Sequence, residues 1–88
     1  MNTLHADKTP DEYADWINQR IGGEVRRLRE ARGWSAYALG RAAGVTDQTI
    51  LNIERANAPR GSLTGTLARI ALRLGLTLSQ LVCAAEAS

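Results

Sequence analysis

Two amide side chains, Gln48 and Asn52, are the residues of this chain best suited to specific recognition chemistry. An amide can donate to N7 of adenine and accept from its N6 group at once, so it can read that base from the major groove of DNA. Residues spaced four apart lie on the same face of a helix, which is the spacing of these two amides. The spacing therefore predicts that both amides lie on one face of a helix, where they are candidates for reading bases.

The polar run around the amides supplies further candidate contacts. Thr46 offers a methyl group for thymine, and Thr49 adds another hydroxyl. Asp47 can accept from cytosine N4, but a carboxylate also repels phosphate and is favourable in the first turn of any helix, which is the role we favour. The alternative for the whole run is an ordinary solvated face. The predicted base-reading set is Thr46, Asp47, Gln48, Thr49 and Asn52.

A first short helix, predicted over 36–43, must precede this polar run. Leu39 and Ala43 lie four apart and share its apolar face. Gly44 supplies the left-handed backbone that ends such a helix, and Gly40 is small enough for a second helix to cross closely. The pattern therefore predicts a tight turn directly after Ala43.

The second helix is predicted over 46–55. Thr46 can cap its start, and Ile50 and Ile53 lie three apart, so they face the same core as the first helix. The polar side chains of this second helix then point outward.

From Ile21 to Val82 the chain resembles the Cro and phage-repressor class of helix-turn-helix proteins, also called the XRE family. The likeness runs through IGGEVRRLREARGWS, the helix pair, NIER and LARIALRLGLTLSQLV. It implies an all-α, five-helix repressor-like domain over 21–84 whose second helix of the pair enters the major groove. The implied function is a DNA-binding transcriptional regulator, expected to be a repressor that acts as a homodimer on double-stranded DNA.

The resemblance also implies contacts with the sugar-phosphate backbone. Arg41, Arg55 and Arg60 fall in segments that lie along the backbone in the family. Ser35 starts the first helix of the pair, where free N–H groups attract a phosphate and its hydroxyl adds a donor. Ala36 stands where the family often has a glutamine that binds phosphate, so we expect this anchor to be weaker or replaced by Arg41.

An ion pair between Arg29 and Glu54 is a further implication of the family. It would hold the recognition helix to the helix before it. Ala56 stands where the family often has glycine, and we expect Asn57 to take the left-handed turn instead.

An additional helix is expected before this domain, in an N-terminal extension over 1–20. Residues 9–12, TPDE, have the order of a capping box with proline at the first helical position. Gly22 and Gly23 favour a break, because each glycine costs about 1 kcal/mol inside a helix. We therefore expect a separate helix over 22–31, with one continuous helix as the alternative.

Tyr13, Trp16 and Ile17 form an apolar stripe on this acidic helix, and two interpretations of it stay open. The stripe either folds onto the domain or contacts a protein partner or a second copy. The second interpretation would suit an antitoxin or adaptor that also represses its own operon. Trp34 is expected to cap the core, and a role in shaping the DNA-facing surface is its alternative.

Two more helices are predicted after the loop ANAPRGS. The fourth helix ends at Gly75 and has an apolar core face made of Leu63, Leu67, Ile70, Ala71 and Leu74. Thr77 and Gln80 form a capping box that starts a fifth helix, and residues 85–88 are expected to fray.

Composition limits the other classes of function. The chain has 88 residues, one cysteine (Cys83) and one histidine (His5), so we expect one small core, no closed zinc site, no cofactor and no enzyme. Cys83 is expected to pack as a small apolar residue.

Residues 1–19 carry a net charge of −3 and residues 20–88 carry +5, so the basic part is the part that resembles the family. Lacking a signal peptide or an apolar span, the protein is expected in the cytoplasm, at the nucleoid, and away from membranes.

Overall fold

A computed structural model describes residues 7–57 and 64–88. The predictions for His5, Arg60 and Leu63 lie outside these described residues. The described parts contain helices and no strand, as the sequence predicts: α1 (Pro10–Ala31), α2 (Ala36–Ala43), α3 (Asp47–Glu54), α4 (Thr64–Arg73) and α5 (Leu78–Ala87).

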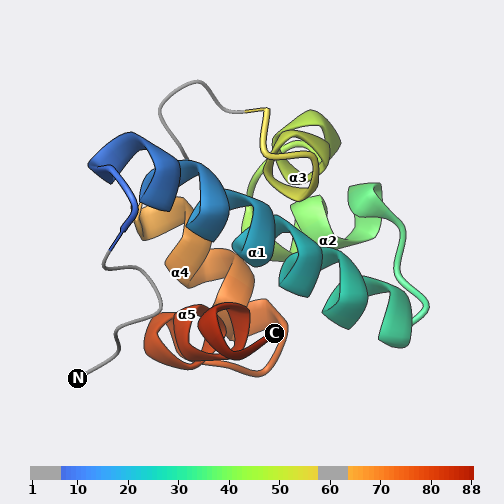
Figure 1. The fold of residues 1–88 in the computed structure, drawn as a ribbon. Coiled ribbons are helices and arrows are strands. Elements are labelled where there is room, and N and C mark those ends of the chain that lie inside the picture. The colour runs from blue at the N-terminus through green and yellow to red at the C-terminus, as the bar shows by residue number, and fades with distance from the viewer. Residues whose placement is uncertain (1–6, 58–63) are drawn as a thin grey trace.

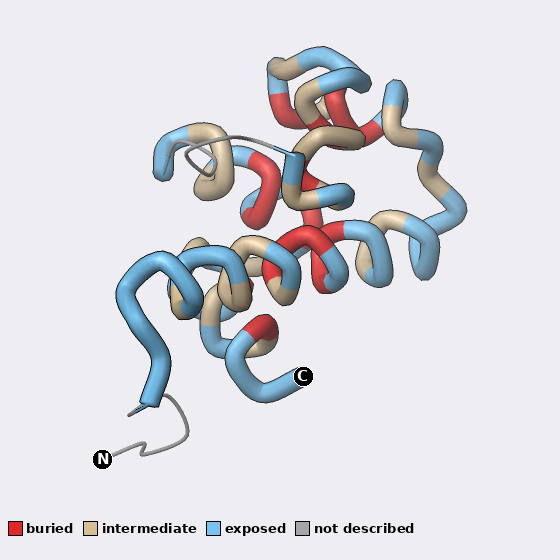
Figure 2. Tube along the Cα trace, turned by 45° about the horizontal axis from the view of Figure 1, so that its top comes forward, coloured by how far each residue is buried: buried red, intermediate tan, exposed pale blue. Residues whose placement is uncertain are grey.

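Helix α1 crosses the whole molecule, with α5 against one side of it and α3 against another (Figure 1). Helix α2 packs on both α3 and α4, so α1 and α2 together connect α3 with α4 and α5. Figure 2 shows the buried residues gathered where these helices face one another. The largest fully buried side chains come from all five helices: Val25, Leu39, Ile50, Ile70 and Leu81.

The expected break near residues 20–23 is wrong, because α1 continues through both glycines for 22 residues. Gly22 is buried, and a Cβ atom there would meet the carbonyl oxygen of Ile53 and lie 2.9 Å from that of Glu54. This glycine therefore serves the close approach of α3 to α1, and the tertiary contact outweighs its poor helix propensity. The predicted additional helix is the first half of α1.

Both predicted capping boxes are confirmed. Thr9 Oγ1 accepts from the backbone N–H of Glu12 at 3.1 Å, and Glu12 Oε1 accepts from that of Thr9 at 2.9 Å. Thr77 and Gln80 make the same exchange at the start of α5. The expected fraying of residues 85–88 is not seen, because α5 continues to Ala87 and packing buries Ala85 completely.

The apolar stripe of the N-terminal half of α1 lies on the domain itself. Ile17 packs against the core, and the Tyr13 hydroxyl donates to Glu86 Oε2 at 3.2 Å. This hydrogen bond raises the pKa of Tyr13, because the tyrosinate could not donate it. The Arg20 guanidinium lies 5.1 Å from the centre of the Trp16 ring and also donates to the carbonyl of the last residue of the chain. The first of the two interpretations thus describes this structure.

Two other side-chain predictions have different outcomes. Trp34 packs against the edge of the core, as expected, and the Arg32 guanidinium lies 5.3 Å from the centre of its ring. Cys83 is exposed, so its predicted burial is wrong. It lies on the outer side of α5, whose inner side is formed by Leu81 and Ala85.

Helix α4 ends at Arg73, and the turn that closes it contains Gly75 with φ +84°, so the chain leaves this helix at the glycine that the sequence predicts. Arg32 Nη2 donates to the carbonyl of Leu74 at 3.0 Å, which ties this end of α4 to the end of α1. Among the described helices, no single one is long and apolar enough to cross a membrane. Helices α4 and α5 pass that test of length and composition only as a pair, bent by 88°.

Candidate nucleic-acid interface

The turn between α2 and α3 depends on two glycines, as predicted. Gly44 ends α2 with φ +76°, a left-handed conformation that few other residues adopt. A Cβ atom at Gly40 would lie 2.8 Å from the carbonyl oxygen of Val45, so only glycine allows this approach. The Val45 N–H donates to the Gly40 carbonyl at 2.8 Å, which holds the two helices together at the turn.

Helix α3 begins with the threonine cap that the sequence predicts. Thr46 Oγ1 accepts from the backbone N–H of Thr49 at 3.1 Å. Asp47 Oδ1 accepts from the N–H of Gln48 at 2.9 Å, which agrees with a helix-start role for this carboxylate. Ile50 and Ile53 are buried on the opposite side of the helix. The polar face of α3 is therefore fixed on the outside.

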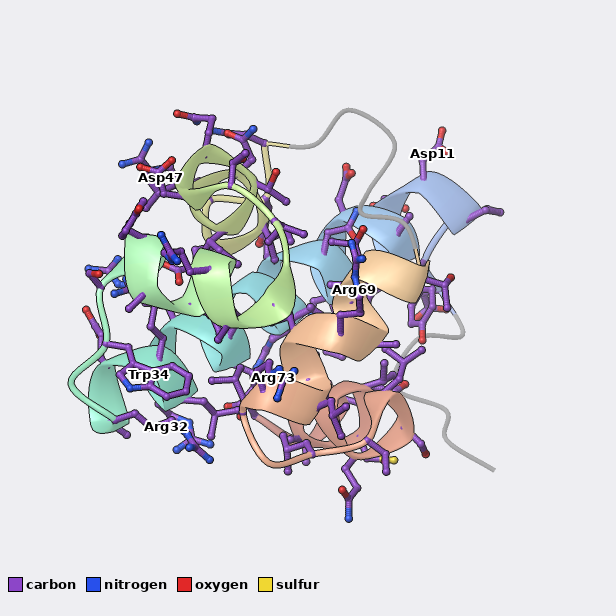
Figure 3. The ribbon with its side chains drawn as sticks, turned by 180° about the vertical axis from the view of Figure 1, so that it is seen from behind. Asp11, Arg32, Trp34, Asp47, Arg69 and Arg73 are labelled. Atoms are coloured by element: carbon purple, nitrogen blue, oxygen red, sulfur yellow. The ribbon has the colours of Figure 1, made fainter. Side chains whose placement is uncertain are left out.

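The predicted base-reading residues lie together on that outer face. Thr46, Asp47 and Gln48 are exposed, and Thr49 and Asn52 are partly exposed. Figure 3 shows Asp47 on the side of α3 that points away from α4. Gln48 Nε2 donates to Asn52 Oδ1 at 2.9 Å, so the amides form a pair before any DNA is bound. The Oε1 acceptor of Gln48 and the Nδ2 donor of Asn52 have no partner among the described residues.

The ion pair implied by the family resemblance is present. Arg29 Nε and Nη2 donate to the two carboxylate oxygens of Glu54 at 2.6 and 2.9 Å. The side chains are only 13% and 4% exposed, respectively. These hydrogen bonds raise the pKa of Arg29, and Arg29 Nη1 also donates to the carbonyl of Trp34 at 2.8 Å. One guanidinium thus joins α1 to the end of α3 and to the segment before α2.

The prediction that Asn57 takes the left-handed turn after α3 is wrong. Ala56 itself has φ +54°, and it is the one non-glycine residue with a positive φ among the described residues. The N–H of Ala56 donates to the carbonyl of Ile53 at 3.1 Å, and the N–H of Asn57 donates to the backbone carbonyl of Asn52 at 2.9 Å. These bonds close the end of α3, and they require the left-handed conformation at Ala56, one position before the predicted Asn57.

Three of the four predicted phosphate-binding residues fall in the described parts of the chain. Ser35 is exposed and caps α2, its Oγ accepting from the N–H of Ala38 at 3.0 Å. Arg41 is exposed on α2, and Arg55 is exposed immediately after α3. The fourth, Arg60, is outside the described residues. Contact of these side chains with phosphate stays a prediction.

One residue of this surface is missing from the predicted set. Tyr37 is 58% exposed on α2, and Arg41 Nη1 donates to its hydroxyl oxygen at 3.3 Å. The signal in the sequence is a tyrosine four positions before an arginine on the exposed side of a helix. Two further arginines, Arg69 and Arg73, project from α4 (Figure 3).

A second acid, Glu24, is buried on α1 with a side chain 8% exposed. Arg27 donates two hydrogen bonds to it at 3.1 and 2.8 Å, and they lower the pKa of Glu24 although burial opposes this. Both residues of this pair lie on α1, apart from the polar face of α3. Within 7–57 and 64–88, no three His, Cys, Asp or Glu side chains form a group that could hold a metal ion.

Comparison with known proteins agrees with this geometry. A family model described as a helix-turn-helix domain matches residues 20–82. Among solved structures, the chain is similar to the clp gene regulator ClgR from Corynebacterium glutamicum, with a TM-score of 0.72 and 20% sequence identity over 81% of this chain and 73% of that one. At this identity the likeness concerns the fold. No match was found among the curated proteins.

Proposed function

The chain belongs to the helix-turn-helix domain family, and from this premise we propose that it is a sequence-specific DNA-binding transcriptional regulator. The observation that carries the proposal is the outer face of α3, where Gln48 and Asn52 present an amide acceptor and an amide donor that have no partner within 7–57 and 64–88. Ile50 and Ile53 hold the opposite face in the core, so this helix stands out from the surface with its polar side chains available. Such a helix fits the major groove, and amide side chains suit adenine there.

The finer proposal is a repressor of the Cro and phage-repressor type that acts as a homodimer. A single recognition helix covers few base pairs, and a second copy on a two-fold symmetric site supplies the remaining specificity. Occupying such a site would block transcription. The similar solved protein is called a gene regulator, which agrees with the general role and leaves the direction of regulation to experiment.

An antitoxin or adaptor that binds a protein through Tyr13, Trp16 and Ile17 is the second candidate. Ile17 packs on the core and the Tyr13 hydroxyl bonds to Glu86, so this stripe already has a role within the chain. We therefore place DNA regulation without a dedicated protein partner first.

Selection from a pool of random duplexes, together with protection mapping on the DNA upstream of the gene, tests the proposal. The wild type should select one family of related sequences and protect it at two salt concentrations. Gln48→Ala and Asn52→Ala should relax the preference at individual base pairs, whereas Arg41→Ala should weaken all sequences alike. Failure of the wild type to prefer any duplex would refute a sequence-specific regulator.

A further inference from the structure

We propose that Tyr37 and Arg41 act together as one clamp for a single phosphate of the DNA backbone. The inference rests on the proposed function and adds to it a residue, Tyr37, and a division of roles. Arg41 supplies the charge, while Tyr37 orients the guanidinium and donates a hydrogen bond of its own.

The side chains of Tyr37 and Arg41 contact each other on the surface of α2. Arg41 Nη1 lies 3.3 Å from the Tyr37 hydroxyl oxygen, and Arg41 Cζ lies 5.9 Å from the centre of the tyrosine ring. The hydroxyl accepts from the guanidinium, so its own proton is free to be donated outward. Two donors thus stand side by side, at a spacing that two oxygens of one phosphate can span.

The rest of α2 makes the pair accessible. The helix reads AYALGRAA, so Tyr37 and Arg41 are its only polar side chains. Leu39, Gly40 and Ala43 are buried, and the other positions are alanine. A smooth helix with two projecting donors allows a DNA strand to come close along its length. Ser35 caps the start of the same helix.

The exposure of Tyr37 also requires an explanation. At 58% exposed, Tyr37 leaves a large apolar ring in solvent beneath its polar hydroxyl, and among the described residues only Leu72 is a comparably exposed large apolar side chain. A purely structural tyrosine usually buries its ring and leaves the hydroxyl at the surface. Here the ring lies beside a guanidinium instead, which restricts the rotamers of Arg41 and so reduces the entropy that it loses when it binds phosphate.

The test measures binding of the full chain to its selected duplex as a function of salt. Tyr37→Phe keeps the ring and removes the hydroxyl, and it should weaken binding about three- to tenfold for all sequences without changing the salt slope. Arg41→Ala should weaken binding more and reduce the slope by about one unit. In the Arg41→Ala background, Tyr37→Phe should cost less than half as much as in the wild type, because both act on one phosphate. Arg26→Ala, an exposed arginine on α1 that lies outside the proposed contacts, is the matched control and should leave the slope unchanged.

A scan with neutral methylphosphonate linkages, one per duplex, identifies the phosphate. The wild type should lose affinity at one position per half-site where the double variant loses none. Equal binding by the wild type and Tyr37→Phe, additive losses, or a lower melting temperature of Tyr37→Phe with unchanged affinity would each overturn the clamp and leave the proposed function intact. Failure of the wild type to bind any duplex would overturn both.

Discussion

Gln48 and Asn52 are hydrogen-bonded to each other on the outer face of α3, the Gln48 Nε2 donating to the Asn52 Oδ1 at 2.9 Å. Each amide fixes the orientation of the other, so their outward atoms form a defined pattern of one acceptor and one donor. Pre-ordered side chains lose less entropy on binding. The two residues should therefore behave as one reading unit.

Replacing either amide should affect specificity at more than one base pair. Each single change should reduce discrimination by about 1–3 kcal/mol at its own base. Because Gln48→Ala also leaves Asn52 without its hydrogen-bond donor, discrimination at the base that Asn52 reads should weaken as well. The double variant should lose less than the sum of the single losses, since the residues are in contact. Competition binding with a set of duplexes that differ by single base pairs measures this. Strictly additive losses would show that the two amides read independently.

Arg29→Met should reduce the free energy of unfolding by about 3–5 kcal/mol, because Glu54 would remain buried without its partner. The matched control is Arg26→Met, which breaks an exposed pair with Glu30 whose side chains are 64% and 55% exposed. That change should cost about 0.3–0.5 kcal/mol. Urea unfolding measures both variants, and equal losses would contradict the role given to the buried pair.

Gly22→Ala and Gly23→Ala should change stability in opposite directions. At Gly22 a methyl group meets the backbone oxygens of Ile53 and Glu54, which cannot move without shifting α3, so a loss of about 1–3 kcal/mol is expected. At Gly23 a Cβ atom meets nothing within 4 Å, so alanine should stabilise the helix by about 0.5–1 kcal/mol. Thermal unfolding of the two variants decides the matter. A stabilised Gly22→Ala protein would mean that α3 does not approach α1 so closely.

Ala56→Gly should stabilise the protein. A left-handed conformation costs alanine about 1–2 kcal/mol, and glycine adopts it freely. Part of this gain is lost to the greater entropy of glycine in the unfolded chain, which leaves a net gain of about 0.5–1 kcal/mol. Ala38→Gly, at an exposed position inside α2, is the control and should destabilise by about 1 kcal/mol. If both variants lose stability, the backbone after α3 is not left-handed at this residue.

The pair of Glu24 and Arg27 should make stability depend on pH in acid. The folded pKa of Glu24 is lowered below its ordinary 4.5 by hydrogen bonds from Arg27. A lowered folded pKa means that the stabilising contribution is complete above the unfolded pKa and is lost as the pH falls through the folded one. Wild-type stability should therefore fall below about pH 4.5 more steeply than that of Glu24→Gln. Arg27→Met should also reduce this slope, and an unchanged acid profile in both variants would exclude the pair as its source.

The fold could be predicted where a local pattern determines the backbone. Thr9 with Glu12, Gly44 and Gly75 each carry a chemical preference that holds whatever surrounds them, and the structure places them as expected. Gly22 could not be interpreted in the same way. Its neighbour Gly23 has the same propensity, and only the approach of α3 shows that one glycine serves packing while α1 continues.

The candidate site shows the same division. The outward direction of Gln48 and Asn52 follows from the spacing of Ile50 and Ile53, so periodicity predicts it. The hydrogen bond between the amides and the pairing of Tyr37 with Arg41 depend on side-chain rotamers, which spacing alone does not fix. The exposure of Cys83 likewise depends on how α5 is rotated against α1 and α4, a choice that involves residues far apart in the sequence.

Because α1 is continuous, the N-terminal extension cannot be removed without cutting through a helix of the domain. A fragment starting at residue 21 would lack the Thr9 cap and the core contact of Ile17, and it would begin one residue before the glycine that touches α3. The polar face of α3 and the N-terminal segment are therefore supported by the same helix, α1. A fusion that transfers this helix-turn-helix region to another protein should therefore include all of α1.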